Sequence, residues 1–426
     1  MCAIIIELVR VRRCLLRSAA FGCALGVAAH AVSASASESL GLNQAIEFAL
    51  QRQPLLESLD ASARAAREAS ISAAQLPDPQ LVGGFRDLPI SSGEAYSFTR
   101  DTDTQIVIGF AQEFPRAQKR RLRGVLHVKE AERLQAEHRL ADCVIRRDAS
   151  LAWLALWRNE MARQISVDMR ATGLLQAQAV GIVAGNGLVS QSDMLLAQLD
   201  VERLDDVIAK RDQALDRSRY ALHRWIGDAA RLPVTQAVPE LPVKPTTSEL
   251  LEGLAQHPEL VVLRQRIDES QVGVELARAN RLPDWRVEVG YGHRREFSDM
   301  VMLQIGMDLP LFARNRQDRK IASALAMGEA ASAQWENGRR QLESRVLQAS
   351  RDLQHLHERL IAYDDKILPQ TMLWIESAGA AWRSGRGTID QMLQARRTRL
   401  DVLMARLKLQ HDLIARQIEL IYLSGG

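Results

Sequence analysis

Two spacings of apolar residues run along the chain and predict two kinds of element. A spacing of about 3.6 residues predicts helix from Leu42 to Gln75. Two long stretches in which prolines are rare, each with one Gly-x-Gly break, predict helical hairpins over residues 115–228 and 312–424. At about 1.5 Å per residue, a helix over residues 116–182 would be roughly 100 Å long. Pro369 lies inside the second hairpin and should kink or interrupt its helix, because proline lacks the backbone donor.

The returning helix of each hairpin repeats an apolar residue every seven positions. Such a repeat indicates helices that pack with a left-handed supercoil. The positions are Val201, Ile208, Leu215 and Leu222 in the first hairpin, and Leu393, Leu400, Leu407, Ile414 and Ile421 in the second.

Strict alternation of apolar residues with polar residues or glycine predicts four β-strands, within residues 79–113 and 284–309. Each run is close to the ~9–11 residues that a tilted strand needs to cross a bilayer. Alternation alone slightly favours a soluble sheet, but the export signal described below and the long hairpins favour a membrane sheet. The predicted membrane-facing residues are Ile106, Ile108, Phe110, Trp285, Val287, Val289, Tyr291, Leu303 and Ile305.

Four strands cannot close a barrel by themselves, and unpaired strand edges in lipid are prohibitively costly. We therefore expect the chain to oligomerise. Three copies would give twelve strands, an even number like that of bacterial barrels. The pattern itself does not choose between two, three and four copies.

The chain contains an internal duplication. Four landmarks recur in order about 200 residues apart: "ALQRQPLL" and "GLAQHPEL", "QLPDPQ" and "RLPDWR", "FAQEFP" and "GMDLPLF", and the breaks "AGNG" and "SGRG". The predicted organisation is a first repeat at 37–232, a proline-rich linker at 233–248 and a second repeat at 249–426.

Residues 1–36 resemble a secretory signal peptide, with a basic patch, an apolar run and small residues that allow cleavage after Ala34 or Ala36. Lipidation at Cys23 is a weaker alternative. Residues 1–36 carry the excess of basic residues that gives the chain its formal net charge of +3. The rest of the chain is balanced in charge, so it has no positive electrostatic field that would favour nucleic-acid binding. Only Cys143 lies beyond residues 1–36, which excludes an intrachain disulfide.

Cations cluster at the start of each hairpin, in "PRAQKRRLR" from Pro115 and "ARNRQDRK" from Ala313. The helix dipole favours acidic residues at this position, so the cations need another explanation. Contact with lipid head groups and a solvated basic face explain them equally well.

The hairpin tips carry two capping-box patterns, Ser190 to Asp193 and Thr388 to Gln391. Glycines precede both, and we expect Gly185 and Gly387 to need a positive φ. Well-made turns explain these patterns physically, and a docking surface is the functional interpretation.

Together, the double repeat, "LPDPQL" before a strand, "QEFP" before a basic helix start and the tips "AGNGLVSQSDMLLAQ" and "SGRGTIDQMLQAR" resemble the TolC family of outer-membrane efflux channels. The "LPDPQLVGGFRDLPIS" segment is most similar to its CzcC and CusC heavy-metal branch. The resemblance covers about residues 40–424.

The resemblance implies a mainly α-helical chain whose homotrimer forms a twelve-stranded β-barrel in the outer membrane and an α-barrel in the periplasm. The implied partners are a periplasmic adaptor, an inner-membrane RND pump and outer-membrane lipid. Asp193 and Asp390 are candidates for the periplasmic constriction. The implied adaptor-docking residues are Gly185, Asn186, Gly187, Leu188, Ser190, Gly385, Arg386, Gly387 and Thr388.

The resemblance implies a passive conduit for heavy-metal ions or other small toxic compounds, with drug efflux and type I secretion as alternatives. We expect no enzyme, cofactor or built-in metal site, because no catalytic set stands out and the histidines are poorly spaced for one metal. A periplasmic coiled-coil adaptor or scaffold is the rival class. Such a protein would carry one hairpin between β-rich halves, whereas here a unit of strands and hairpin is duplicated.

Overall fold

The computed structural model describes residues 39–426, except residues 92, 188 and 242–245. The predicted signal peptide, including Cys23, and the tip residue Leu188 lie outside the described residues, as does part of the predicted linker. Residues 39–426 form one unit by their contacts.

Two helices, α1 (Leu42–Gln51) and α2 (Pro54–Ala73), open the unit. The expectation of one helix from Leu42 to Gln75 was wrong. Gln53 is extended at φ −90° and ψ 106° because the proline that follows it disfavours helical backbone. Pro54 is instead the first residue of α2, where a missing N–H costs nothing.

Four strands form one antiparallel sheet in chain order, which confirms the predicted β part. They are β1 (Gln80–Arg86), β2 (Gln105–Phe114), β3 (Trp285–His293) and β4 (Met300–Met307). The central pair joins the two halves, since β2 belongs to the first repeat and β3 to the second. The outer strands β1 and β4 form the edges of the sheet.

The first hairpin consists of α3 (Ala117–Gly185), which has 69 residues, and α4 (Gln191–Ile226). A 3₁₀ turn (Gly227–Arg231) follows it. Two helices, α5 (Thr247–Gly253) and α6 (Pro258–Ala279), then lead to β3. The second hairpin consists of α7 (Gln317–Ala362), α8 (Leu368–Arg383) and α9 (Ile389–Leu423).

Pro369 interrupts the second hairpin as expected. A π-helical segment, Tyr363–Ile367, separates α7 from α8, and Pro369 lies in the first turn of α8. The wider π turn accommodates the proline ring and the missing backbone donor, a usual cause of a helix irregularity.

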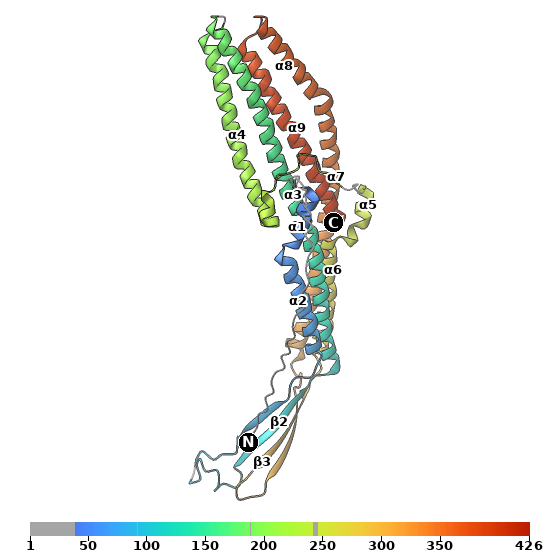
Figure 1. Ribbon diagram of the computed structural model, residues 1–426. Helices are drawn as coiled ribbons and strands as arrows, with labels where there is room; N and C mark the ends of the chain where they lie inside the picture. The colour runs from blue at the N-terminus through green and yellow to red at the C-terminus, as the bar shows by residue number, and fades with distance from the viewer. Residues whose placement is uncertain (1–38, 92, 188, 242–245) are drawn as a thin grey trace, which may run out of the picture. The chain divides into compact units, whose positions relative to one another are not determined.

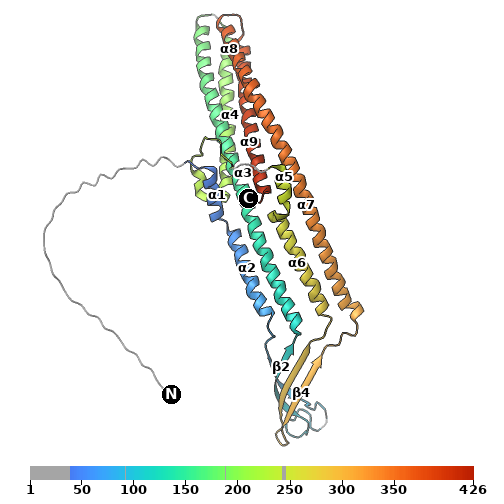
Figure 2. The same cartoon turned by 90° about the vertical axis from the view of Figure 1, so that its right-hand side faces the viewer.

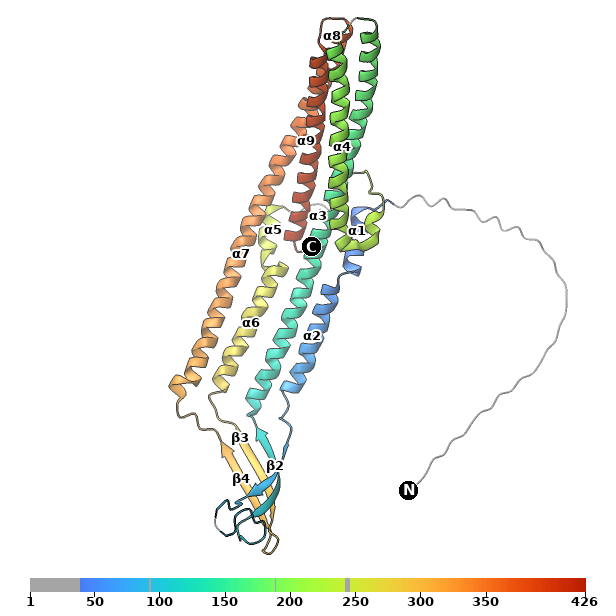
Figure 3. The same cartoon turned by 90° about the vertical axis from the view of Figure 1, so that its left-hand side faces the viewer.

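The long helices lie side by side (Figures 1, 2 and 3). Near the sheet the order is α2, α3, α6 and α7. Towards the tips α3 packs with α4 and α9, and α9 packs with α8. Three apolar clusters support this arrangement, centred on Trp153, on Leu342 and, at the tips, on Val180. Helix α9 contributes to all three, and its buried heptad residues lie in two of them: Leu407 and Ile414 in the Trp153 cluster and Leu393 in the tip cluster.

Candidate functional site

The sheet exposes one apolar face. Residues paired directly across antiparallel strands point to the same side. The register places Ile108 beside Tyr291 and Val289 beside Leu303 on this face. Leu303 is 68% exposed and Phe110 is 63% exposed, so the face is not part of a core. All nine predicted membrane-facing residues lie on it; eight are exposed, and Val287 is partly buried.

The opposite face of the sheet carries mostly polar side chains and glycines, together with Val82, Val107, Ala111, Met300 and Met302. Arg286 on β3 donates a hydrogen bond to Oε1 of Gln80 on β1 at 2.9 Å, which spans the intervening strand. The backbones also approach closely, because a Cβ on Gly109 would lie only 2.7 Å from the carbonyl oxygen of Val289. The glycines of this face are Gly84, Gly109, Gly290, Gly292 and Gly306.

The basic start of α3 binds the other half of the chain. Lys119 is 4% exposed, and its Nζ donates to the Leu282 carbonyl at 2.5 Å and to Oδ2 of Asp284 at 2.9 Å. The backbone N–H of Arg116 donates to Oδ1 of Asp284 at 3.0 Å. Arg120 donates to the Ala74 carbonyl at the end of α2. For Lys119, therefore, both expectations were wrong: it lies neither against lipid nor in solvent.

Asp284 is held as a carboxylate by this arrangement. Partial burial opposes its ionisation, but the hydrogen bonds from Lys119 and from the Arg116 backbone keep the pKa of Asp284 below its usual range. The interaction depends on a partner in the second repeat, so no local pattern in the sequence could have shown it.

Both hairpin tips contain the predicted capping boxes. At the first tip, Oγ of Ser190 accepts from the Asp193 N–H at 3.1 Å, and the Asp193 carboxylate accepts from the Ser190 N–H at 3.3 Å. At the second tip, Thr388 and Gln391 make the same two bonds at 3.3 and 3.2 Å. These bonds satisfy backbone donors that a helix start leaves free.

The glycines with positive φ are not the expected pair. Gly187 and Gly385 have φ of 72°, whereas Gly185 is the last residue of α3 and Gly387 has no positive φ. Counted back from the N-cap residues, Gly187 and Gly385 hold equivalent positions, three residues before Ser190 and Thr388. Matching the two Gly-x-Gly motifs letter by letter therefore placed the tips two residues out of register.

The candidate docking and constriction residues lie at these tips. Gly185, Asn186, Gly187, Ser190, Gly385, Arg386 and Thr388 are exposed, and Gly387 is partly buried against Ala381. Asp193 is the third residue of α4 and Asp390 the second residue of α9. Asp193 uses its carboxylate for its own cap. The two aspartates therefore hold different places in otherwise similar turns.

A buried ion cluster joins the two hairpins below the tips, and the sequence reading missed it. Asp200 on α4 pairs with Arg396 on α9, and both side chains are at most 5% exposed. Arg397 pairs with the other oxygen of Asp200 at 2.8 Å, and Arg396 also donates to Gln176 on α3 at 2.6 Å. Arg396 lies three residues after the heptad leucine Leu393, close to the apolar face of α9. A charged residue at this position was the one sequence feature that could have indicated a buried ion pair.

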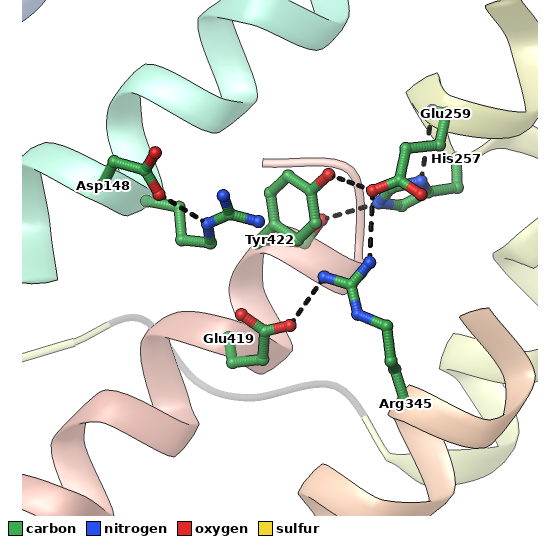
Figure 4. Close-up of polar contacts among 7 residues, drawn as sticks. Asp148, His257, Glu259, Arg345, Glu419 and Tyr422 are labelled. Carbon is green, nitrogen blue, oxygen red and sulfur yellow. Dashed lines mark hydrogen bonds and ion pairs between the residues drawn. The ribbon is translucent and has the colours of Figure 1, made fainter. Parts of the chain in front are cut away.

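A second polar network lies around Tyr422, near the end of α9 (Figure 4). The Tyr422 hydroxyl donates to Glu259, and Arg345 bridges Glu259 at 3.2 Å and Glu419 at 2.7 Å. Nε2 of His257 lies 3.1 Å from the Tyr422 carbonyl oxygen. The Arg147 guanidinium lies 4.4 Å from the centre of the Tyr422 ring. The network ties α3, α6, α7 and α9 together.

Within the described part of the chain, no group of three or more His, Cys, Asp or Glu side chains is arranged to hold a metal ion.

None of the helices among the described residues combines the length and the apolar character needed to cross a membrane.

This arrangement, two long helical hairpins joined to a small antiparallel sheet, is the fold of solved outer-membrane channels. The structure of CusC superposes with a TM-score of 0.77 at 16% identity, covering 91% of this chain and 93% of that chain. VceC, an outer membrane protein of Vibrio cholerae, gives 0.75 at 20% identity, covering 90% and 96%. The CmeC outer membrane channel of Campylobacter jejuni gives 0.76 at 13% identity, covering 90% and 85%.

Residues 251–426, most of the second repeat, match the family model described as outer membrane efflux protein. No curated protein sequence matches the chain. These matches confirm the predicted fold of the chain itself, mainly helical with a small four-stranded antiparallel sheet. Because VceC and CmeC match about as well as CusC, the comparisons do not single out the CzcC and CusC branch.

Proposed function

We propose that this protein is the outer-membrane channel of a tripartite efflux system and acts as a passive conduit. One observation carries the proposal: the sheet presents an exposed apolar face on one side and a polar, glycine-rich face on the other. A sheet with these two faces matches the surfaces that a transmembrane barrel turns to lipid and to its interior. The family match and the channel folds support the same function.

In this proposal three copies close the sheet into one barrel, and the helical hairpins extend into the periplasm. The exposed tips around Gly187 and Gly385 are the surface for a periplasmic adaptor, with an inner-membrane RND pump supplying the driving force. Asp193 and Asp390 lie at the same end and are the proposed constriction. The channel does not change its cargo chemically.

The proposed cargo is heavy-metal ions or other small toxic compounds. The resemblance of "LPDPQLVGGFRDLPIS" to the CzcC and CusC branch supports metal ions. Drug efflux and type I secretion are the competing cargoes for the same channel, because selectivity of such a system resides mostly in the pump.

A periplasmic adaptor or scaffold is the competing class. It offers no reason for an exposed apolar sheet face that includes Leu303 at 68% and Val301 at 79%. In water such a patch is an association liability rather than a stable surface.

Conductance of the detergent-extracted protein in a planar bilayer, measured together with its oligomeric mass, tests the proposal. Discrete channels from a trimer support it, and a soluble monomer contradicts it. Leu303→Arg should reduce membrane insertion, because a cation on the lipid face costs about 2–4 kcal/mol at mid-bilayer. The matched control Gln304→Arg, on the opposite face, should insert normally.

A further inference from the structure

The internal duplication shows how one repeat binds another. Near the sheet, the first repeat meets the second through the strand pair β2–β3 and the helix pair α3–α6. At the junction of these pairs, Lys119 and the backbone of Arg116 hold Asp284. The chain therefore contains one complete example of a contact between repeats.

Because the chain is duplicated, it also carries a second set of residues equivalent to those of this contact. These residues do not contact each other within the chain. Arg319 holds the position in α7 that Lys119 holds in α3, the third helical residue. Arg316 is the N-cap as Arg116 is, but its backbone N–H already donates to the Ala313 carbonyl at 3.3 Å, so Arg319 alone is the counterpart donor. Leu-Pro-Asp precedes a strand in both repeats, so Asp78 corresponds to Asp284.

The residues of this second set lie at opposite edges of the unit. Asp78 follows α2 and precedes the edge strand β1, whereas Arg319 lies in the first turn of α7, which follows the edge strand β4. Both side chains are exposed, and within the described residues neither takes part in an ion pair. Their opposite charges suit them to each other.

We propose that Arg319 of one copy binds Asp78 of the next copy, and that β4 and α7 of one copy pack against β1 and α2 of the next. A second copy is the partner because the chain presents both halves of the contact, one at each edge. Such a head-to-tail contact closes into a ring when the rotation allows. Exposed apolar residues line both edges, including Ile71 at 59% on α2 and Met327 at 67% on α7.

The duplication also fixes the strand register of this contact. In the first repeat Gly83 on β1 pairs with Ile108 on β2. In the second repeat Val289 on β3 pairs with Leu303 on β4 at the equivalent position. By this correspondence Tyr291 is equivalent to Phe85, and Ile108 to Leu303.

The observed pairing of Ile108 with Tyr291 across β2 and β3 then places Leu303 opposite Phe85 of the next copy. Both residues belong to the exposed apolar face, so this register keeps that face continuous across copies. A shift of one residue would move the apolar side chains of the strand to the opposite face of the sheet.

This inference rests on the proposed homotrimer, and cysteine cross-linking in the full-length protein separates the two. In a background with the native cysteines replaced by serine, Leu303→Cys with Phe85→Cys should form disulfides between copies under mild oxidation. The product should be a covalent trimer on a denaturing gel, reversed by reductant. Two strands lie between these positions within one chain, roughly 14 Å, which disfavours an internal bond.

The matched control is Gln304→Cys with Phe85→Cys, whose side chains point to opposite faces, and it should cross-link at least tenfold less. If the protein is a trimer by mass but Val301 or Ile305 cross-links to Phe85 better than Leu303 does, the proposed register is wrong. If it is a trimer and none of these pairs cross-links, the proposed surface is wrong. If it is not a trimer, the proposed function fails first.

Charge reversal tests the ion pair independently. Arg319→Asp and Asp78→Arg should each lower the temperature at which trimers dissociate by several degrees, and the double variant should recover most of the loss. Arg314→Asp, in the 3₁₀ turn before α7, is the control and should have little effect. Absence of recovery in the double variant would contradict the pairing.

Discussion

Nζ of Lys119 lies 2.9 Å from Oδ2 of Asp284, although the two residues are 165 positions apart in the chain. Lys119 is buried, whereas the Asp284 side chain is 34% exposed. Lys119→Met should therefore reduce the free energy of unfolding by about 1–3 kcal/mol, because the variant leaves a carboxylate and a carbonyl without their donor. Denaturant unfolding in detergent measures the change.

Lys210→Met provides the control for Lys119. Lys210 is 71% exposed and pairs with Asp206 on its own helix, so its removal should change stability by less than about 0.5 kcal/mol. Equal effects of the two substitutions would show that the buried contact does not hold the repeats together.

The corrected tip geometry makes a prediction about glycine. Gly187→Ala and Gly385→Ala should each destabilise their turn by about 1–2 kcal/mol, because a Cβ is disfavoured at a positive φ. Gly185→Ala should be neutral or stabilising, since Gly185 is helical and nothing lies within 4 Å of the added Cβ. Hydrogen exchange of tip amides measures the effect, and faster exchange in Gly185→Ala than in Gly187→Ala would contradict it.

Removing one charge from the ion cluster below the tips should lower stability strongly, whereas replacing both charged residues with apolar ones should not. Asp200→Asn leaves Arg396 buried without its full counter-charge and should cost about 3–5 kcal/mol. The double variant Asp200→Leu with Arg396→Met removes both charges and should recover much of that loss. The thermal unfolding midpoint compares them. A double variant as unstable as Asp200→Asn would mean that the cluster has a net stabilising role beyond charge compensation.

Stability should fall as the pH is lowered below about 6.5, the usual pKa of histidine. Burial lowers the pKa of His257 although the Glu259 charge and the bond to the Tyr422 carbonyl oppose it, and burial also lowers the pKa of His411. The unfolded chain therefore takes up these protons at a higher pH than the folded chain does, which favours unfolding on acidification. Nδ1 of His257 also accepts from the Glu259 N–H, a bond that protonation removes.

His257→Asn should flatten the dependence of the unfolding midpoint on pH between about 7 and 5, with His411 retaining part of the slope. Asparagine still serves as an N-cap, so the variant tests titration more than capping. An unchanged slope in His257→Asn would remove His257 from the acid response.

Local patterns predicted the strands and the helix caps. The pleat turns alternate residues to opposite faces, so the exposed run through Ile106, Ile108 and Phe110 follows from residue order alone. The capping boxes at Ser190 and Thr388 need only residues three positions apart. These features do not depend on where the rest of the chain lies.

Features that depend on distant partners were beyond the sequence. Lys119 belongs to a basic run typical of a solvated surface, and only the second repeat supplies the carbonyl and carboxylate that bury it. Asp200 and Arg396 likewise resemble surface charges until α4 and α9 bring them together. The break before Pro54 is different, because the proline itself was a sufficient signal.

The glycine-rich face of the sheet has a consequence for what can pass through the proposed channel. At Gly84, Gly109, Gly290, Gly292 and Gly306 no side chain covers the wall, so the backbone itself forms the surface there. The same face carries charged side chains such as Arg286 and Glu288, and the glycines leave room for water beside them. We infer that the sheet end of the proposed channel behaves as a hydrated exit lined by charged side chains.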